Sequence, residues 1–209
     1  MPVVPEATLT REVIASLGDR PGPTVAHEYR EDAVPTPLHG VERLLRKRHA
    51  VRSFDCQDLP AEQLAQIMGT ARDCYRAQWP AAGDDLCLLL TTRSASGPGN
   101  GAVHSVDLSA PPRTDPVPVG DCHELPQLYA DAPALLLVCG DLGGPAAAAY
   151  PDLLVRAGAL GHAIWLAGLA AGLDGCVFGR AHHRISQLAH QVRPGYRHLF
   201  TVALGHPDE

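Results

Sequence analysis

Lysine is almost absent from this sequence, and several features that mark common protein classes are missing too. The cationic side chains are 16 arginines and a single lysine, Lys47. A mechanism that needs a lysine at another position is therefore excluded. The formal net charge is −6, so the chain as a whole does not attract nucleic acid.

The chain also lacks paired cysteines and an export signal. None of its six cysteines forms a CxxC pair, and the first residues show neither a basic segment nor a long apolar run. We therefore expect a cytoplasmic protein with reduced, mostly buried thiols. One of these cysteines and three histidines would be candidate zinc ligands, but their spacing matches no zinc motif, and we expect no metal. The four residues are Cys122, His123, His182 and His183.

One long apolar run stands out, at residues 153–173. About 20 apolar residues are enough to cross a bilayer, but a helix that is apolar on all sides is also found inside globular proteins. This run is solitary, contains Arg156 and His162, and has no flanking aromatic belt or basic cluster. We interpret it as a buried core helix that packs inside the domain or across a subunit interface, and we expect no membrane association.

Residues 1–38 differ from the rest of the chain. They hold six of the 19 prolines and show little periodicity, apart from one possible short helix at 9–17. We predict an N-terminal arm without a core of its own at 1–38, followed by one domain at 39–209.

Helices and a few strands alternate through residues 39–209, which favours an α+β fold. Apolar periodicity predicts helices that begin near 39 and 61 and others at 123–130, 153–173 and 181–192. Apolar runs predict strands at 85–92, 102–108, 130–141, 175–179 and 198–205, with 130–141 at the centre of the sheet. Residues 109–121 are rich in proline and are predicted to be a connection.

A basic cluster follows the first helix, which is unusual in an acidic protein. It suits either a solvated helix C-terminus or a phosphate site, because the planar guanidinium of arginine binds phosphate through two hydrogen bonds. The spacing leaves both interpretations open. The cluster comprises Arg43, Arg46, Lys47, Arg48 and Arg52.

Over residues 40–207 the order of segments resembles the nitroreductase-like family of FMN flavoproteins. Residues 48–54, Arg-His-Ala-Val-Arg-Ser-Phe, are similar to the family's first FMN motif. Residues 157–158 and 166–176 are similar to its central helix, and residues 194–196 and 202–207 are similar to its closing strand.

Three further segments resemble one branch of this family, the SagB-type dehydrogenases and related peptide oxidase domains. SagB-type dehydrogenases oxidise azolines to azoles in ribosomal peptides. The segments are residues 79–83, 86–90 and 101–107.

The resemblance implies a fold, a cofactor and a partner. We expect a central mixed or antiparallel sheet around a long buried helix, helices on both sides, and a homodimer with FMN at its interface. The implied cofactor contacts come from the first motif, where Arg48 and Arg52 would hold the phosphate, from the turn at residues 82–83, and from glycine-rich backbone. The positions are Arg48, His49, Ala50, Arg52, Ala82, Gly83, Gly175, Cys176 and Gly179.

The sequence departs from the family at several of these positions. A family serine is replaced by Ala50, and the turn carries Ala81 in place of another. The Lys-Tyr pair of azoline dehydrogenases becomes Ala149-Tyr150, and a Gln-Asn pair of the central helix becomes His162-Ala163. No arginine or lysine follows Gly205, where many nitroreductases place a phosphate ligand.

Tyr150 is therefore the surviving candidate acid or base, with His162 and His104 as substitutes. Each has a structural alternative that the sequence does not remove. Tyr150 would equally serve as an aromatic anchor at the start of the helix, and His162 as a core histidine bonded to a carbonyl.

The resemblance and the departures from it leave three alternative functions. The first is an FMN-dependent dehydrogenase or oxidase that acts on a peptide or peptide-like natural product, free or bound to a carrier or leader. The second is an NAD(P)H-dependent nitro or quinone reductase, which needs little from side chains beyond the flavin. The third is a relative without flavin that keeps the scaffold as a partner subunit or for non-redox chemistry.

Overall fold

The computed structural model describes residues 40–80, 85–93, 101–108, 117–143 and 150–208. All of them belong to the compact unit His39–Glu209. The predicted arm at 1–38, with its helix at 9–17, lies outside the described residues, as do Ala82 and Gly83. The division between arm and domain stays a prediction.

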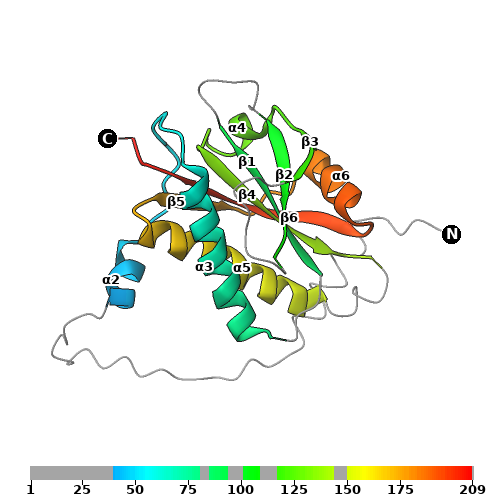
Figure 1. The fold of residues 1–209 in the computed structure, drawn as a ribbon, viewed down its shortest axis with the longest axis horizontal. Coiled ribbons are helices and arrows are strands. Elements are labelled where there is room, and N and C mark those ends of the chain that lie inside the picture. The colour runs from blue at the N-terminus through cyan, green and yellow to red at the C-terminus, as the bar shows by residue number, and fades with distance from the viewer. Residues whose placement is uncertain (1–39, 81–84, 94–100, 109–116, 144–149, 209) are drawn as a thin grey trace, which may run out of the picture. The chain divides into compact units, whose positions relative to one another are not determined.

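A six-stranded sheet forms the centre of the unit (Figure 1). Its strands are β1 Leu86–Thr92, β2 Ala102–Val106, β3 Val117–Asp121, β4 Ala134–Asp141, β5 Asp174–Phe178 and β6 Tyr196–Gly205. They lie in the order β3-β2-β1-β4-β6-β5, and each pair of neighbours is antiparallel. The predicted central strand is confirmed, since β4 lies inside the sheet and seven of its eight residues are buried.

Strand β3 corrects the prediction of a proline-rich connection at 109–121. It pairs with β2, and Pro118 lies opposite His104. Proline lacks an N–H donor and usually indicates an interrupted strand, but an edge strand needs donors on one side only. Position at the edge of the sheet therefore permits a strand that the local sequence does not suggest.

Helices cover both faces of the sheet, as expected. They are α2 Gly40–Lys47, α3 Ala61–Gln78, α4 Leu125–Leu128, α5 Tyr150–Ala170 and α6 His183–Val192. Helices α3 and α5 pack together over one face in a first core cluster, and α4 and α6 contribute to a second cluster on the other face. Together these elements give the predicted α+β architecture (Figure 1).

The long apolar run forms α5, which begins three residues earlier than predicted and ends at Ala170. Its end is a Schellman motif, in which the Leu173 N–H donates to the Gly168 carbonyl at 2.9 Å and the Gly172 N–H to the Leu169 carbonyl at 3.2 Å. Gly172 has φ +83°, a left-handed conformation that favours glycine. Gly172 therefore supplies the left-handed residue on which the helix ends.

One face of α5 is buried in the core, as expected of a core helix, and the other face is exposed. Leu153, Ala157, Leu160 and Ile164 enter the core, whereas Val155 on the other side is exposed. Among the described helices, α5 alone has the length and apolar composition of a membrane span, and 44% of its most apolar window is buried here. The helix thus keeps an apolar face that the described residues do not cover.

An ion pair explains the one arginine in the apolar run. The Arg156 guanidinium donates to Asp85 Oδ1 at 2.7 Å and to the Tyr75 hydroxyl at 3.3 Å, and a second bond reaches Asp85 Oδ2. These hydrogen bonds to Asp85 raise the pKa of Arg156 despite its burial. Arg156 therefore connects α5 to α3 and to the residue that precedes β1.

Candidate functional site

The basic segment after α2 lies along the outer edge of β5. Ala50 forms a parallel bridge with Gly175, and the Val51 N–H donates to the Gly175 carbonyl at 3.0 Å. Further along, Phe54 is buried and bridges Pro207. These contacts hold residues 50–54 against the last two strands.

Arg48 turns from this segment onto the exposed face of α5. Its guanidinium carbon lies 4.8 Å from the centre of the Trp165 ring, a cation–π contact. Its Nη1 donates to Nδ1 of His162 at 3.3 Å. His162 and Trp165 are three residues apart on α5, so they share one side of the helix. Two side chains of α5 therefore orient Arg48.

His162 acts toward Arg48 as a neutral hydrogen-bond acceptor. Burial lowers the pKa of His162, and the nearby charge of Arg48 lowers it further. A neutral imidazole has one acceptor nitrogen, and here Nδ1 faces the guanidinium. The other nitrogen, Nε2, then carries the proton and is able to donate to a ligand.

Arg52 adds a second cation near the same strand. Its guanidinium carbon lies 5.8 Å from the ring centre of Phe178, at the end of β5. Because Gly175 offers its carbonyl outward to Val51, the backbone groups of Val177, two residues later, also point outward. The edge of β5 thus presents the Val177 N–H. Arg48 lies on the α5 side of this edge, and Arg52 covers Phe178, which packs with the second core cluster on the other side. Cations and an edge amide of this kind suit an anion.

A hollow of about 430 Å³ lies beside Arg48 and Val177. Its wall is mostly apolar, and it is formed by α5, β5, β6 and the side chain of Arg48. At Gly179 an added Cβ would meet nothing within 4 Å, so the backbone there is open to a ligand. The lining residues are Arg48, Leu154, Gly158, Gly161, His162, Trp165, Val177, Gly179, Leu199 and Phe200.

The residues present fit FMN in two respects. The two arginines and the edge amide match a phosphate, and the apolar wall matches a flat aromatic ring. In addition, Nε1 of Trp165 is buried and has no hydrogen-bond partner within the described part of the chain. An orphaned donor beside the hollow is a group that a ligand acceptor would satisfy.

Other predicted cofactor positions contribute less directly. Nδ1 of His49 donates to the Lys47 carbonyl at 2.9 Å, so this side chain turns back toward α2. The Cys176 thiol is buried and donates to the Val177 carbonyl at 3.7 Å. Gly175 is tightly packed, since an added Cβ would lie 2.6 Å from the Ala203 carbonyl oxygen. Ala50 supplies the bridge to β5 rather than a hydroxyl.

The three predicted catalytic side chains do not come together within the chain. Tyr150 opens α5, 12 residues before His162, which corresponds to about 18 Å along the helix axis. It is half-buried against the first core cluster. His104 lies on β2, four strands from β5, or about 19 Å across the sheet. Only His162 lies beside Arg48.

Sequence reasoning missed Trp165, which both orients Arg48 and lines the hollow. The signal was available, since Trp165 follows His162 by three residues on a predicted helix. Leu199 and Phe200 carried no such signal. They reach the hollow because β6 lies between β4 and β5.

Comparison with known proteins places this architecture among solved folds. No protein-family model matches the chain, and no curated protein matches it. A candidate nitroreductase from Ralstonia eutropha JMP134 is similar in structure, with a TM-score of 0.61 and 19% identity over 84% of this chain and 89% of its own.

Two further structures have the same architecture. A candidate nitroreductase from Exiguobacterium sibiricum, solved in complex with FMN, has a TM-score of 0.57 and 15% identity over 85% of this chain and 92% of its own. Nitroreductase A from Vibrio parahaemolyticus has a TM-score of 0.52 and 18% identity over 83% and 70%. The chain therefore has the nitroreductase-like fold.

Proposed function

We propose that this protein is an FMN-dependent oxidoreductase. The observation that carries the proposal is Arg48, which is held by His162 and Trp165 and lines an apolar hollow, with Arg52 at the end of the same strand, β5. The Exiguobacterium structure of the same fold contains FMN, which supports this choice of ligand. When bound, FMN would supply the hydride chemistry, while the protein supplies binding and orientation.

In this proposal Arg48 and Arg52 bind the phosphate, with the Val177 N–H as an additional donor. Trp165 and His162 hold the Arg48 guanidinium in place, which lowers the entropy lost when the phosphate binds. The apolar side chains of β6 and α5 exclude water from the ring. Loss of the hydroxyl at Ala50 removes one phosphate ligand but neither arginine.

For the substrate we propose a peptide or peptide-like natural product that undergoes a two-electron oxidation such as azoline to azole. The similarity of residues 79–83, 86–90 and 101–107 to azoline dehydrogenases supports this choice. Tyr150 is the proposed proton-transfer residue. A ribityl chain separates the phosphate of FMN from its reacting ring, so Tyr150 need not lie beside Arg48.

A second candidate function is reduction of nitro compounds or quinones with NAD(P)H. The structural similarity to nitroreductases favours it, and so does the absence of a lysine beside Tyr150, since Lys47 is the only lysine. Such a reaction requires little from side chains beyond flavin binding. NAD(P)H oxidation with a nitroaromatic acceptor but no oxidation of an azoline peptide would select this function.

The two proposals share one decisive test, the absorbance spectrum of the purified protein with mass spectrometry of the material released on denaturation. We expect flavin absorbance and release of FMN at close to one per subunit, or uptake of added FMN to that ratio. A colourless protein that takes up no FMN would reject both functions. It would favour the flavin-free alternative, in which the hollow serves as a binding surface.

We further propose that the protein works as a cytoplasmic homodimer. The uncovered face of α5 is apolar, with Leu154 and Val155 exposed, and it borders the hollow. Exposed apolar surface of this kind is typical of a subunit interface. A second copy on this face would enclose the hollow and shield FMN from water.

A further inference from the structure

Two cysteines face each other across the middle of the sheet. Cys87 of β1 is the direct cross-strand partner of Cys139 of β4. Both side chains belong to the second core cluster, so they project to the same face of the sheet. The pair is 52 positions apart in the sequence, and it is brought together only by the register of β1 on β4.

The backbone spacing of this pair permits a disulfide. On the same ladder, the Asp141 N–H donates to the Asp85 carbonyl at 2.9 Å. Hydrogen-bonded pairs recur every second residue in an antiparallel ladder, so Cys87 and Cys139 form such a pair, with Cα atoms about 5.5 Å apart. Disulfides join residues whose Cα atoms are about 4.4–6.8 Å apart and whose Cβ atoms are about 3.5–4.5 Å apart. The Cα spacing meets this condition, whereas the Cβ atoms of a hydrogen-bonded pair are about 5.5 Å apart, so the two cysteines must move closer together for the bond to form.

The thiol of Cys139 is fully buried in the sheet. It donates to the Leu137 carbonyl oxygen, with the sulfur and the oxygen 3.7 Å apart. Burial raises the pKa of Cys139 well above its ordinary value, and the neighbouring Cys87 contributes in the same direction. Cys139 is therefore a weak nucleophile on its own, and the first step of any oxidation falls to Cys87.

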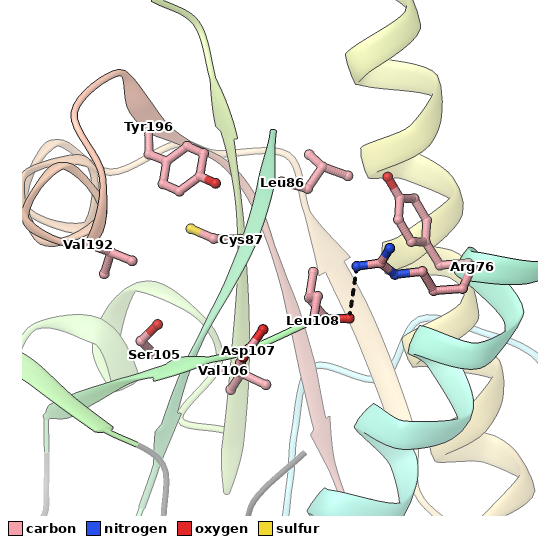
Figure 2. Close-up of a pocket in the computed structure, with 10 residues that line it drawn as sticks. Arg76, Leu86, Cys87, Ser105, Val106, Asp107, Leu108, Val192 and Tyr196 are labelled. Atoms are coloured by element: carbon pink, nitrogen blue, oxygen red, sulfur yellow. Dashed lines mark hydrogen bonds between the residues drawn. The ribbon is translucent and has the colours of Figure 1, made fainter. Parts of the chain in front are cut away.

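Access to the two thiols differs. Cys87 is 7% exposed and lines a cavity of about 230 Å³ at one end of the sheet. Figure 2 shows its sulfur pointing to the side of β1 on which Val192 and Tyr196 lie. Cys139 is 0% exposed. A small reagent that enters the cavity therefore meets Cys87 before Cys139.

The ladder between β4 and β6 is interrupted beside Cys139. Val138 pairs with Phe200 and Cys139 with His198, which leaves Leu199 as an extra residue on β6. In such a bulge the strand with the extra residue bends, and the ladder is locally disrupted. Cys139 is therefore held less tightly on its β6 side than a residue in an unbroken ladder, which favours a small movement of Cys139 toward Cys87.

We propose that Cys87 and Cys139 are a redox-active pair that a small hydroperoxide converts into a disulfide between β1 and β4. The Cys87 sulfur attacks the peroxide, the O–O bond breaks, and Cys87 becomes a sulfenic acid while the peroxide leaves as water or an alcohol. The Cys139 sulfur then displaces the hydroxyl as water. Two electrons pass from the two thiols to the peroxide, and no other reactant is needed.

The inference is independent of FMN binding and is tested on the full chain with hydrogen peroxide. A double variant, Cys56→Ala with Cys74→Ala, removes the two exposed thiols. After treatment of the folded protein, digestion without reductant and mass spectrometry should give a cross-linked peptide pair that contains residues 87 and 139. The mass of the cross-linked peptides should be two hydrogens below the summed mass of the two reduced peptides. A thiol reductant should separate them and restore both cysteines.

Single variants in that background test the order of the steps. With Cys139→Ala, we expect Cys87 to accumulate as a sulfenic acid that dimedone traps. With Cys87→Ala, Cys139 should remain a free thiol. Cys122→Ala and Cys176→Ala, which remove the other buried thiols, should leave the cross-link unchanged.

The proposal is overturned if the folded double variant gives no link between Cys87 and Cys139, or if Cys139 is oxidised at an unchanged rate in the Cys87→Ala protein. Circular dichroism of each variant establishes that the folded state is the one that reacts. A link that forms only after denaturation would also reject the pair as a feature of the native sheet.

Discussion

Arg48 is held by two residues of α5 and faces the hollow, so its removal should affect ligand binding more than folding. We expect Arg48→Ala to weaken FMN binding by about 10- to 100-fold, because a hydrogen bond to a charged group contributes about 1.5–3 kcal/mol. Fluorescence titration of the apoprotein with FMN measures this change. Arg46→Ala, an exposed cation in the last turn of α2, is the matched control and should bind FMN normally.

His198 is a buried histidine on β6 whose titration should appear in the stability of the protein. Its Nδ1 accepts from the His182 N–H at 2.9 Å, and its Nε2 lies 3.1 Å from the Thr201 hydroxyl. Burial lowers the pKa of His198 from 6.5 to about 4. Below pH 6.5 the unfolded chain therefore binds a proton that the folded chain does not.

We thus expect the contribution of His198 to be complete at pH 7 and to decline as the pH falls from about 6.5 to about 4. The decline should total about 3 kcal/mol. Urea unfolding at a series of pH values measures it, and His198→Asn should flatten the curve in this window. His183→Asn, at an exposed position of α6, should not change it; an equal slope in wild type and His198→Asn would contradict the prediction.

At this scale the basic cluster stood out in an acidic chain, and the family resemblance then implied Arg48 and Arg52 within it as the phosphate ligands. It did not predict that Trp165 stacks on Arg48, or that His104 lies across the sheet from it. Such contacts depend on strand order, which residue types do not encode locally.

Among the elements, α5 shows how glycine sets the distance between a helix and the sheet. A Cβ at Gly168 would lie 2.8 Å from Leu204 Cδ2, a fully buried side chain, whereas a Cβ at Gly158 would meet nothing within 4 Å. We expect Gly168→Ala to destabilise the fold by about 1–3 kcal/mol through overpacking. Gly158→Ala should be neutral or stabilising by up to about 1 kcal/mol in the monomer. Chemical denaturation compares the two.

The ion pair between Arg156 and Asp85 offers a second test of how α5 is fixed. Asp85→Asn leaves the guanidinium, whose side chain is 9% exposed, with only the exposed carboxylate of Asp152, 3.5 Å from its Nε. We expect a loss of about 2–4 kcal/mol, below the value for a fully buried pair because the Asp85 side chain is 29% exposed. Asp73→Asn is the control, since its bond to Arg72 lies at the surface, and it should cost under about 1 kcal/mol.

The elements themselves were largely predictable. Apolar periodicity located α3, α5 and α6 and the strands β1, β4, β5 and β6. The exception was β3, where Pro118 concealed an edge strand. Local sequence cannot show whether a backbone nitrogen faces a neighbour or solvent, and that difference decides whether proline is tolerated.

For the whole molecule, the proposed homodimer predicts a mass of about twice 22.2 kDa in solution. Val155 is 63% exposed on the uncovered face of α5, so Val155→Arg should convert the dimer to a monomer without unfolding it. Light scattering coupled to gel filtration measures the mass. Val117→Arg, at a position on β3 that is 60% exposed, should remain dimeric. A monomeric wild-type protein would remove this interface from the proposal.

The sequence by itself determined the class of the protein. Its alternation of periodic segments specified an α+β domain, and its scarcity of lysine restricted the chemistry available near Tyr150. These properties follow from local composition and spacing, which the chain carries before it folds.

Only the tertiary structure decided which residues meet. Arg48 reaches His162, 114 positions away, and Cys87 faces Cys139, because the order and register of the strands bring distant segments together. Register is set by how both faces of the sheet bury their apolar side chains at once, which is a property of the whole core. For that reason the site and the cysteine pair are visible in the fold and not in any single stretch of sequence.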